Sequence, residues 1–404
     1  MLEPDDARAR ILAAITPLGP VERQLDEASG YVLARDITSP VSLPLWPNSA
    51  MDGYACRAGD VARADAGAPV RLRVTERVAA GGFPVRAVGV GEAIRVATGA
   101  PVPSGADTVI RIEDTDRGDV LVEIRDARDA GRNVRAAGED ITAGQIALRA
   151  GTVLGPAQIA LAAAVGAAVV YVHRRPRVAI ISTGDELVRV KAFGEVMAGR
   201  RIVSSNSYGL VAAVRKLGAE PVDGGIVRDD RATLETAMER AASCDLIITT
   251  AGVSVGDADY VKAVVASLGG SVDFWRVRMR PGSPLAFGTV RGAPWLGLPG
   301  NPVSALVTFT LFAQPAILRL MGHGNPVTHR IQVIADEVFS PAPSLTHFVR
   351  VTLDRSQPGS PRARLAGPQA SNILSSLAHA DALMIVPPDR ASVEPGDVLE
   401  AIPL

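Results

Sequence analysis

The fold is decided by residues 245–260, which read DLIITTAGVSVGDADY. Leu246 to Thr250 is a run of apolar and β-branched residues, which predicts a buried strand. A loop of small residues, Ala251 to Gly256, ends the strand, and a helical pattern begins at Tyr260. A strand, a glycine-bearing turn and a helix start form the crevice at the carboxyl end of a parallel sheet, where open α/β sheets bind ligands. The stretch therefore predicts a ligand site in an α/β domain.

Two carboxylates, Asp257 and Asp259, accompany the start of that helix. Backbone N–H groups exposed at a helix start favour anions, and neighbouring carboxylates suit Mg²⁺ or the positioning of a reactive group. The alternative interpretation is that Asp259 only caps the helix. The stretch alone supports both interpretations equally.

The flanking segments extend this pattern into a central three-layer α/β domain with a mostly parallel sheet, which we assign to residues 177–325. Val178 to Ser182 reads as another strand that is buried on both faces. A strand is predicted at residues 222–227, and helices are predicted at residues 206–217 and 233–242. Asp230 is placed to cap the second of these helices.

A longer helix is predicted at the end of this domain. Asn301 is expected to cap it, with Pro302 at its first position. The helical pattern runs to about Met321, and Pro315 predicts a kink within it.

Polar loops follow the strands of this domain, and parallel strands would place these loops at one edge of the sheet. Their residues are Asp185, Glu186, Asp229, Asp230, Asp257, Asp259 and the segment 299–301. Arg276, Arg278 and Arg280 have strand spacing and are expected on one face, where three guanidinium groups suit a phosphate-bearing ligand. A solvated strand face is the alternative. The chain shows no Ser-His-Asp or Cys-His set, dinucleotide fingerprint or Walker loop, so the residues alone predict a metal-assisted, anion-binding α/β enzyme.

Residues 1–176 are predicted as an N-terminal mixed region that carries an inserted β-domain at about residues 56–140. A helix is expected at residues 5–15, and a second short helix with an extended segment is expected at residues 20–43. Residues 43–55 read LPLWPNSAMDGYA. Polar groups between aromatic side chains favour a part of a binding site there over a packed surface loop.

Polar residues of the inserted β-domain are further candidates. Thr98 stands at a predicted strand end with its hydroxyl free. Arg135 has a guanidinium group that suits bidentate binding of a phosphate. Glu139 and Asp140 are either ligands or simple turn residues.

The C-terminal residues, 328–404, change to short alternating runs separated by Pro and Gly turns. This pattern predicts a small all-β domain or a partly open barrel. The expected fold class is therefore multi-domain, with α/β and β parts.

Composition and charge exclude several classes of protein. A formal net charge of −1 over 404 residues argues against a general binder of nucleic acid or of membrane surfaces. The longest apolar run, residues 159–172, is too short to span a bilayer, and the N-terminus has no signal-peptide pattern. The five histidines lack metal-ligand spacing, and Cys56 and Cys244 fit a reducing compartment. We therefore expect a cytoplasmic protein.

Six short motifs are spread along the chain. They are NSAMDGYA (48–55), ATGAPVPSGAD (97–107), GEDI (138–141), STGDEL (182–187), GVSVGDADYV (252–261) and GLPGNPVSAL (297–306). In this order they resemble the motifs of the molybdopterin molybdenumtransferase family, also called MoeA, to which the gephyrin E domain belongs. The resemblance covers nearly the whole chain and is far more specific than one glycine-rich loop.

The resemblance implies an elongated homodimer whose active site lies between the α/β domain of one subunit and the N-terminal region of the other. It implies a transferase of molybdenum cofactor biosynthesis, which needs Mg²⁺, inserts molybdenum from molybdate into adenylylated molybdopterin and releases AMP. A molybdopterin adenylyltransferase and molybdoenzymes that accept the cofactor are the protein partners that it implies.

The resemblance also carries site residues over to this sequence. The catalytic residues that it implies are Asp52, Thr98, Asp140, Glu186, Asp229 and Asp259. The Mg²⁺ ligands are expected among Glu186, Asp229 and Asp259. The substrate-binding residues are expected to be Arg135, Ser182, Thr183, Gly184, Asn206, Gly252, Ser254, Arg276, Arg280, Pro299, Gly300, Asn301 and Pro302.

Three positions depart from the usual pattern of the family. Pro47 replaces an acidic residue, Ala251 replaces a glycine and Ser283 replaces a lysine. Ala251 adds a methyl group where φ > 0 or close ligand approach is expected. The lost charge at Ser283 would weaken phosphate binding by roughly 1–3 kcal/mol if that bond is charge-assisted.

These departures motivate an alternative function, in which a weak paralogue binds or scaffolds molybdopterin without turnover. A third hypothesis is a molybdopterin adenylyltransferase, which the α/β domain alone resembles. The additional N-terminal and C-terminal domains argue against it.

Overall fold

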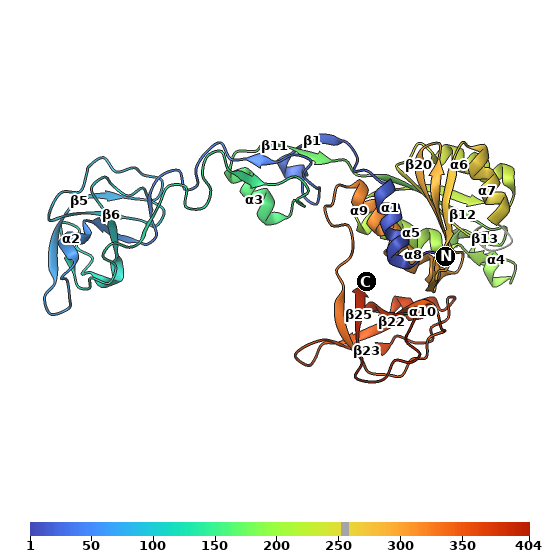
Figure 1. Cartoon of the computed structure of the whole chain (residues 1–404). Coiled ribbons are helices and arrows are strands. Elements are labelled where there is room, and N and C mark those ends of the chain that lie inside the picture. Colours follow the sequence, from blue (N-terminus) through green and yellow to red (C-terminus); the bar gives the residue numbers. More distant parts are fainter. Residues whose placement is uncertain (252–257) are drawn as a thin grey trace.

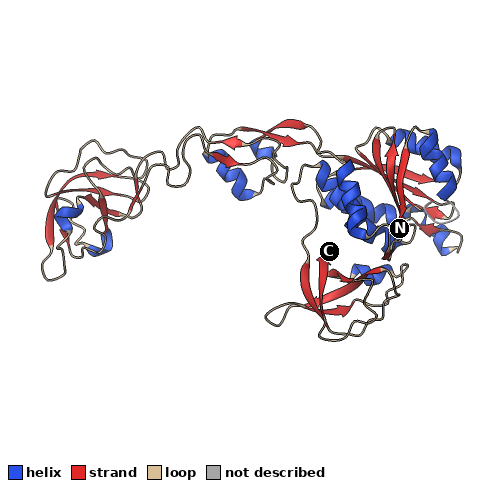
Figure 2. Cartoon of the chain, viewed as in Figure 1, coloured by secondary structure: helices blue, strands red, loops and turns tan. Residues whose placement is uncertain are grey.

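The structure, a computed structural model, describes residues 1–251 and 258–404, without the side chains of residues 258–260. Figure 1 shows an elongated molecule with a small β-domain at one end and an α/β domain at the other. A slender segment that contains β1, β11 and α3 joins the two, and the C-terminal β-domain lies beside the α/β domain. Most of the helices lie in the α/β domain (Figure 2).

The α/β domain is built on a six-stranded, mostly parallel sheet, as predicted. The strand order is β15 (Glu220–Val227), β12 (Arg177–Thr183), β16 (Leu246–Thr250), β20 (Ala293–Leu298), β19 (Pro284–Val290) and β17 (Ser271–Arg276). The first four strands run parallel, β19 pairs antiparallel with β20, and β17 pairs antiparallel with β19, so β19 alone is reversed in this sheet. Every residue of β16 is buried, which explains an apolar and β-branched sequence that does not alternate.

Helices cover both faces of this sheet. One layer contains α1 (Pro4–Ala14), α5 (Ser205–Lys216), α8 (Pro302–Thr308) and α9 (Gln314–Leu320), and the other contains α6 (Arg231–Ala241) and α7 (Ala258–Ser267). Alternate residues of β12 enter the two cores: Val178 belongs to the core that includes Ile11 of α1, and Ala179 belongs to the core that includes Met238 of α6. The first helix of the chain therefore belongs to the core of the α/β domain.

The helix after β20 continues through residues 302–320 but changes its winding in the middle. A π-helical turn, η4 (Phe309–Ala313), separates α8 from α9, and Pro315 stands at the start of α9. Because proline has no N–H to donate, the predicted irregularity near Pro315 takes the form of this wider turn. The helix is long and apolar enough to cross a membrane, yet 72% of its apolar window is buried inside the molecule, as in a core helix.

The segment that joins the two ends is a ladder of short strands. β1 (Pro20–Gln24) pairs antiparallel with β11 (Val169–His173), and β2 (Ile37–Thr38) pairs with β10 (Ile146–Leu148). The short helix predicted within residues 20–43 is therefore wrong, since the chain forms β1 and one 3₁₀ turn, η1 (Leu25–Glu27). Pairing with a strand nearly 150 residues later in the chain overrides the local pattern. The single helix of this segment is α3 (Pro156–Ala164).

The β-domain at the far end is a five-stranded sheet. Its order is β7 (Thr108–Arg111), β4 (Gly53–Cys56), β6 (Glu92–Val96), β5 (Val70–Val78) and β8 (Leu121–Ile124). A short helix, α2 (Ala58–Val61), packs beside it, and Tyr54 and Ile94 fill the cores on the two sides of the sheet. Burial raises the pKa of the Cys56 thiol to about 12, which makes this residue an inert part of the core.

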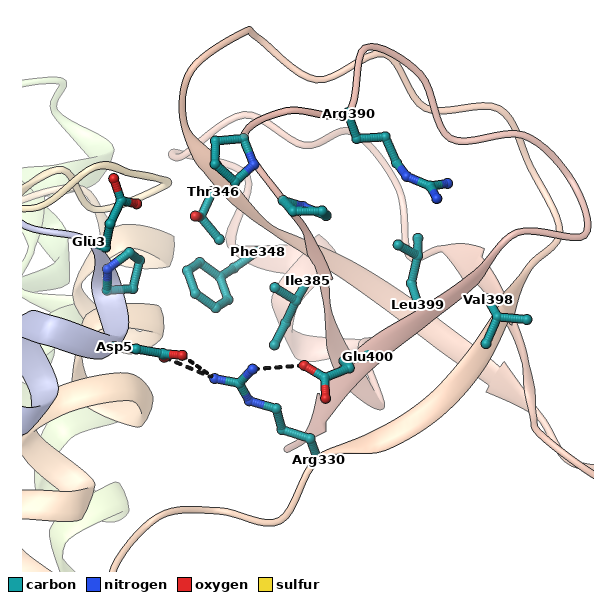
Figure 3. A pocket seen from close by; sticks show the side chains of 13 residues that line it. Glu3, Asp5, Arg330, Thr346, Phe348, Ile385, Arg390, Val398, Leu399 and Glu400 are labelled. Carbon is teal, nitrogen blue, oxygen red and sulfur yellow. Dashed lines mark hydrogen bonds and ion pairs between the residues drawn. The ribbon is translucent and has the colours of Figure 1, made fainter.

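The C-terminal β-domain is a closed barrel, which confirms the predicted fold class. Its strands are β21 (Ile331–Ala335), β22 (Thr346–Asp354), β23 (Arg362–Leu365), β24 (Ala382–Val386) and β25 (Val398–Pro403), and the pairing of β22 with β24 closes it. A short helix, α10 (Leu374–Ala378), covers one side. Figure 3 shows how Arg330 links this barrel to α1, through hydrogen-bonded ion pairs with Asp5 (2.9 and 3.0 Å) and Glu400 (2.7 Å).

The three arginines expected on one strand face are divided between two sheets. Arg276 ends β17 in the α/β sheet, whereas Arg280 lies in β18 (Met279–Arg280), which pairs parallel with β22 of the barrel. Arg278, between these strands, forms an ion pair with Glu3 at 3.1 Å. The expected common face of guanidinium groups is therefore wrong, because the chain leaves one sheet for the other within this stretch.

Candidate functional site

A cavity of about 580 Å³ opens at the carboxyl ends of β12, β16 and β20. This is the edge at which the sequence predicted a ligand site. The starts of α5 and α8 also contribute residues to its lining. The lining includes Thr183, Glu186, Ile202, Ser205, Asn206, Thr250, Ala251, Pro299, Gly300, Asn301, Pro302 and Asn372.

Buried hydroxyl groups fix the start of α5 against the sheet. Thr250 Oγ1 donates to Ser182 Oγ over 3.1 Å, and Ser182 Oγ lies 3.1 Å from Ser207 Oγ. Ser207 bonds in turn with the hydroxyl of Ser204. Each of these buried hydroxyls is hydrogen-bonded, as burial of a polar group requires. Ser182, predicted to bind substrate, supports the cavity from behind its wall.

Asn206 joins the start of α5 to the loop after β20. Its Nδ2 donates to the carbonyl oxygen of Gly300 over 2.7 Å. Its Oδ1 is buried and has no hydrogen-bond partner among the described residues. An unpaired buried acceptor costs about 1–3 kcal/mol, so a donor that reaches this atom would be stabilised there.

Glu186 supplies the one charged side chain of the cavity lining within residues 1–251 and 258–404. The chain bends just before it, at Gly184, where φ is 151°. A Cβ atom at this position would lie 2.8 Å from Glu186 Oε2. Glycine therefore leaves the space into which the carboxylate of Glu186 folds.

Ala251 adopts a φ of 69°, in the left-handed region that favours glycine. The expectation that this position needs φ > 0 is confirmed. The methyl group of Ala251 also lies close to Gly300, since a Cβ atom on Gly300 would lie 3.3 Å from it. The backbone of Ala251 is therefore strained, and its methyl group lies close to Gly300, at a position where glycine is the expected residue.

The other carboxylates at this edge have different tasks or lie outside the described part. Asp230 caps α6, as predicted, by accepting hydrogen bonds from Thr233 N (2.9 Å) and Thr233 Oγ1 (2.6 Å). Asp185 forms an ion pair with Arg228 at 3.6 Å. Asp229 is not part of the cavity lining. The remaining predicted residues, Gly252, Ser254, Asp257 and the side chain of Asp259, lie outside the described residues.

Oxygen donors of the cavity fit a Mg²⁺ ion in part. Mg²⁺ is usually held by one or two carboxylates together with phosphate oxygens and waters. Glu186 and the unpaired Oδ1 of Asn206 are donors of this hard type. No group of three or more His, Cys, Asp or Glu side chains gathers as a metal site among the residues searched, which are the described ones. The set of Glu186, Asp229 and Asp259 therefore stays a prediction.

The predicted site residues of the N-terminal region lie in and beside the β-domain, at the other end of the molecule. Thr98 donates from its backbone N (2.6 Å) and its Oγ1 (2.8 Å) to Asp52 Oδ1. These two bonds, the backbone one first, hold the pKa of Asp52 below its ordinary value. Arg135 lies in β9 (Val134–Arg135), directly opposite Asn48 of β3 (Asn48–Ser49). Asp140 is exposed nearby along the chain.

These two groups of residues do not meet within one chain. Asp52 precedes β4 and Thr98 follows β6, so both belong to the β-domain. Figure 1 shows this domain and the α/β domain at opposite ends of the molecule.

Basic side chains are absent from the described lining of the cavity, and the predicted Arg135, Arg276 and Arg280 do not line it. Ser283 cannot replace the usual lysine as a cation, and its hydroxyl donates to Val277 O over 2.9 Å.

Sequence reasoning missed Asn372, which the barrel contributes to the lining. Val303 N donates to Ser371 O over 3.2 Å and holds that barrel loop at the start of α8. A contact between domains leaves no local signal in the sequence.

Comparison with known proteins follows the same division of the chain. The model of the MoeA N-terminal region (domain I and II) matches residues 2–166, a probable molybdopterin binding domain matches residues 179–319, and the MoeA C-terminal region (domain IV) matches residues 332–404. A protein of Mycobacterium tuberculosis (strain ATCC 25618 / H37Rv) named molybdopterin molybdenumtransferase 2 is 41% identical over 388 residues, with 94% of each chain covered. The chain belongs to the molybdopterin molybdenumtransferase (MoeA) family.

Further MoeA relatives agree in sequence and in structure. The molybdopterin molybdenumtransferase of Nostoc sp. (strain PCC 7120) is 40% identical over 386 residues, which are 92% of this chain and 86% of that protein. The crystal structure of the molybdopterin biosynthesis moeA protein from Pyrococcus horikoshii OT3 aligns with a TM-score of 0.86 at 29% identity and covers 100% of both chains. The predicted family is confirmed, and at that level so is the predicted enzyme class, a transferase of molybdenum cofactor biosynthesis.

Proposed function

We propose that this MoeA family chain inserts molybdenum from molybdate into adenylylated molybdopterin, with Mg²⁺-dependent release of AMP. The observation that carries the proposal is the cavity at the ends of β12, β16 and β20, where Glu186 and Asn206 stand among neutral hydrogen-bonding groups. Apart from Asn372, the residues that line the cavity lie in the segment that matches a probable molybdopterin binding domain.

The cavity binds the organic part of the substrate and orients it. Thr183, Asn206 and Asn301 offer donors and acceptors, and Pro299 and Pro302 give the wall a fixed backbone. Holding the reacting groups in one geometry is itself a large contribution to rate. The hydrogen bonds among the hydroxyl groups of Ser182, Ser207 and Thr250 fix the start of α5, so this part of the cavity lining can hold the substrate in one geometry.

Cleavage of the phosphoanhydride leaves extra negative charge on the departing AMP phosphate. A Mg²⁺ ion, when bound, would neutralise that charge, and Glu186 and Asn206 are the described residues that would hold it. Without a cation the carboxylate of Glu186 would repel the phosphate, which is the physical reason for including Mg²⁺.

A second copy of the chain completes the site in this proposal. Its Arg135 would clamp a phosphate bidentately, and its Asp52 and Thr98 would reach the same cavity. The protein is therefore proposed to be a cytoplasmic homodimer. A molybdopterin adenylyltransferase would supply its substrate, and molybdoenzymes would accept its product.

The alternative is a MoeA-like protein that binds or scaffolds the pterin without turnover. The absence of a basic side chain from the described lining favours this alternative, as does the Ser283 hydroxyl bonded to Val277. Tight binding of adenylylated molybdopterin without AMP release would establish it.

A pair of neighbouring carboxylates tests the proposed site. Glu186→Gln removes the charge of the cavity, and we expect the rate of AMP release to fall by about 10²-fold or more. Asp185→Asn is the matched control, because Asp185 is exposed and paired with Arg228 outside the lining. Full activity of the Glu186 variant would overturn this assignment.

A further inference from the structure

The cavity carries a charge that opposes its proposed ligand. Glu186 is the one charged side chain of the lining within residues 1–251 and 258–404, and it is negative. Together with the two linked phosphate groups of the ligand it makes about three negative charges, of which one Mg²⁺ ion offsets two. The basic residues predicted for this task, Arg276 and Arg280, do not line the cavity. The proposed site therefore needs a cation from a residue outside the described lining.

Arg201 stands next to this carboxylate along a short strand pair. β13 (Leu187–Val188) pairs parallel with β14 (Ile202–Val203), the first residue of one opposite the first residue of the other. Ile202 N donates to Glu186 O over 2.9 Å. One position before this register, Arg201 therefore lies beside Glu186, on chain segments about 5 Å apart. Both strands contribute residues to the cavity lining, so Arg201 lies at the rim of the cavity.

The backbone before Arg201 is fixed, whereas its side chain is held loosely. The turn after α4 (Phe193–Met197) contains Gly199 with a φ of 69°, and Arg200 N donates to Glu195 O over 3.1 Å. This pattern is the Schellman motif, which closes the end of a helix. The Arg201 Nε lies 3.9 Å from Glu195 Oε2, and its side chain is 41% exposed. A long, partly exposed ion pair contributes little, so the guanidinium group can leave it at small cost.

We propose that Arg201 binds the phosphoanhydride of adenylylated molybdopterin, as a substrate-binding residue in addition to those that the motifs supply. The inference rests on the proposed function. When the substrate binds, the guanidinium group turns from Glu195 to the phosphate oxygens beside Glu186. Its planar shape allows two parallel hydrogen bonds to one phosphate group. The positive charge that Ser283 does not provide thus comes from a different segment of the chain.

Arg200 provides the matched control for this contact. It lies in the turn after α4, one residue farther from Glu186, and its loss changes the net charge of the protein equally. Calorimetric titration with adenylylated molybdopterin, with Mg²⁺ and without molybdate, measures binding to each variant. We expect Arg201→Gln to raise the dissociation constant about tenfold, because a charged hydrogen bond is lost. Arg200→Gln should change it by less than about twofold, and Arg201→Lys, which keeps the charge but not the paired donors, should lie between the two.

Salt dependence and thermal stability separate a direct contact from a structural effect. The difference between Arg201→Gln and the wild type should shrink as the salt concentration rises, because ions screen the lost charge. The thermal midpoints of both Gln variants should stay close to that of the wild type, since both side chains are exposed. A lower midpoint for Arg201→Gln, with a loss of affinity that does not depend on salt, would show a structural role and overturn the contact.

The remaining outcomes distinguish this inference from the proposed function. Equal dissociation constants for Arg201→Gln and the wild type overturn the inference and leave the proposed function standing. Equal weakening by the two Gln variants also overturns it, because the general charge of the segment then attracts the ligand. A wild-type chain that binds no adenylylated molybdopterin overturns the proposed function together with this inference.

Discussion

Thr98 donates two hydrogen bonds to one carboxylate oxygen of Asp52, from its backbone N at 2.6 Å and from its hydroxyl at 2.8 Å. This arrangement keeps Asp52 ionised and fixes its orientation on an otherwise exposed loop. The two bonds also join Asp52, which precedes β4, to Thr98, which follows β6. Because β4 and β6 pair with each other, this strand pair positions both residues.

Thr98→Val should raise the pKa of Asp52 toward its ordinary value. The variant keeps the backbone N–H but loses the hydroxyl donor, so part of the lowering remains. Since the bonds favour the ionised form, their stabilisation is present above the pKa of the unfolded chain and is lost as the pH falls through the folded pKa. NMR titration of the Asp52 carboxyl measures the shift directly. An unchanged pKa would show that the backbone bond alone sets it.

Ala251→Gly should stabilise the protein by about 0.5–1 kcal/mol. The gain comes from relief of the left-handed conformation, at which a Cβ atom costs roughly 1–2 kcal/mol, less the extra freedom of glycine when unfolded. Denaturant unfolding measures this change. Gly300→Ala is the matched test of close approach, since its new Cβ atom would meet Ala251 at 3.3 Å, and it should destabilise the protein. A destabilised Ala251→Gly protein would contradict this explanation.

Arg330→Met should loosen the barrel from α1. It removes the ion pairs to Asp5 and Glu400 that Figure 3 shows, which together contribute about 1 kcal/mol or less because all three groups are partly exposed. We expect faster proteolysis of the segment between α9 and β21, with a small change in thermal midpoint. Arg291→Met is the control, because its pair with Glu239 lies within the α/β domain. Equal proteolysis of the two variants would argue against a link between domains.

Arg350→Met should destabilise the barrel by roughly 2–4 kcal/mol. The side chain is fully buried, and its guanidinium group donates to Ser376 Oγ (2.8 Å), Pro368 O (3.0 Å) and Ala370 O (3.2 Å). Truncation leaves these acceptors unpaired in the interior. Arg364→Met removes a cation from the surface of the same barrel, where it pairs with Asp336, and should cost far less. Urea unfolding of both variants gives the comparison, and similar losses would refute the argument.

The α/β domain could be predicted because its strands are short, apolar and separated by turn residues. Leu246 to Thr250 is buried on both faces, and a fully apolar run is the local sign of that burial. Asp230 could likewise be recognised as a cap from its place before a helical pattern. The short helix expected within residues 20–43 does not form, because β1 in this segment is defined by its distant partner β11.

The site could be predicted only in part, for a related reason. Glu186, Asn206 and Pro299 follow strands or begin helices of one domain, so strand order places them together. Asn372 reaches the cavity from the barrel, and the strand that was expected to carry Arg276 and Arg280 divides between two sheets. Both features depend on how domains pack, which local sequence patterns do not encode.

The most direct measurement is AMP release from adenylylated molybdopterin by the purified protein, with Mg²⁺ present and with molybdate either added or omitted. We expect release that depends on molybdate, together with a molybdenum-loaded pterin product. Tight binding of the substrate without molybdate-dependent release would contradict the proposed activity and identify the protein as a carrier or scaffold.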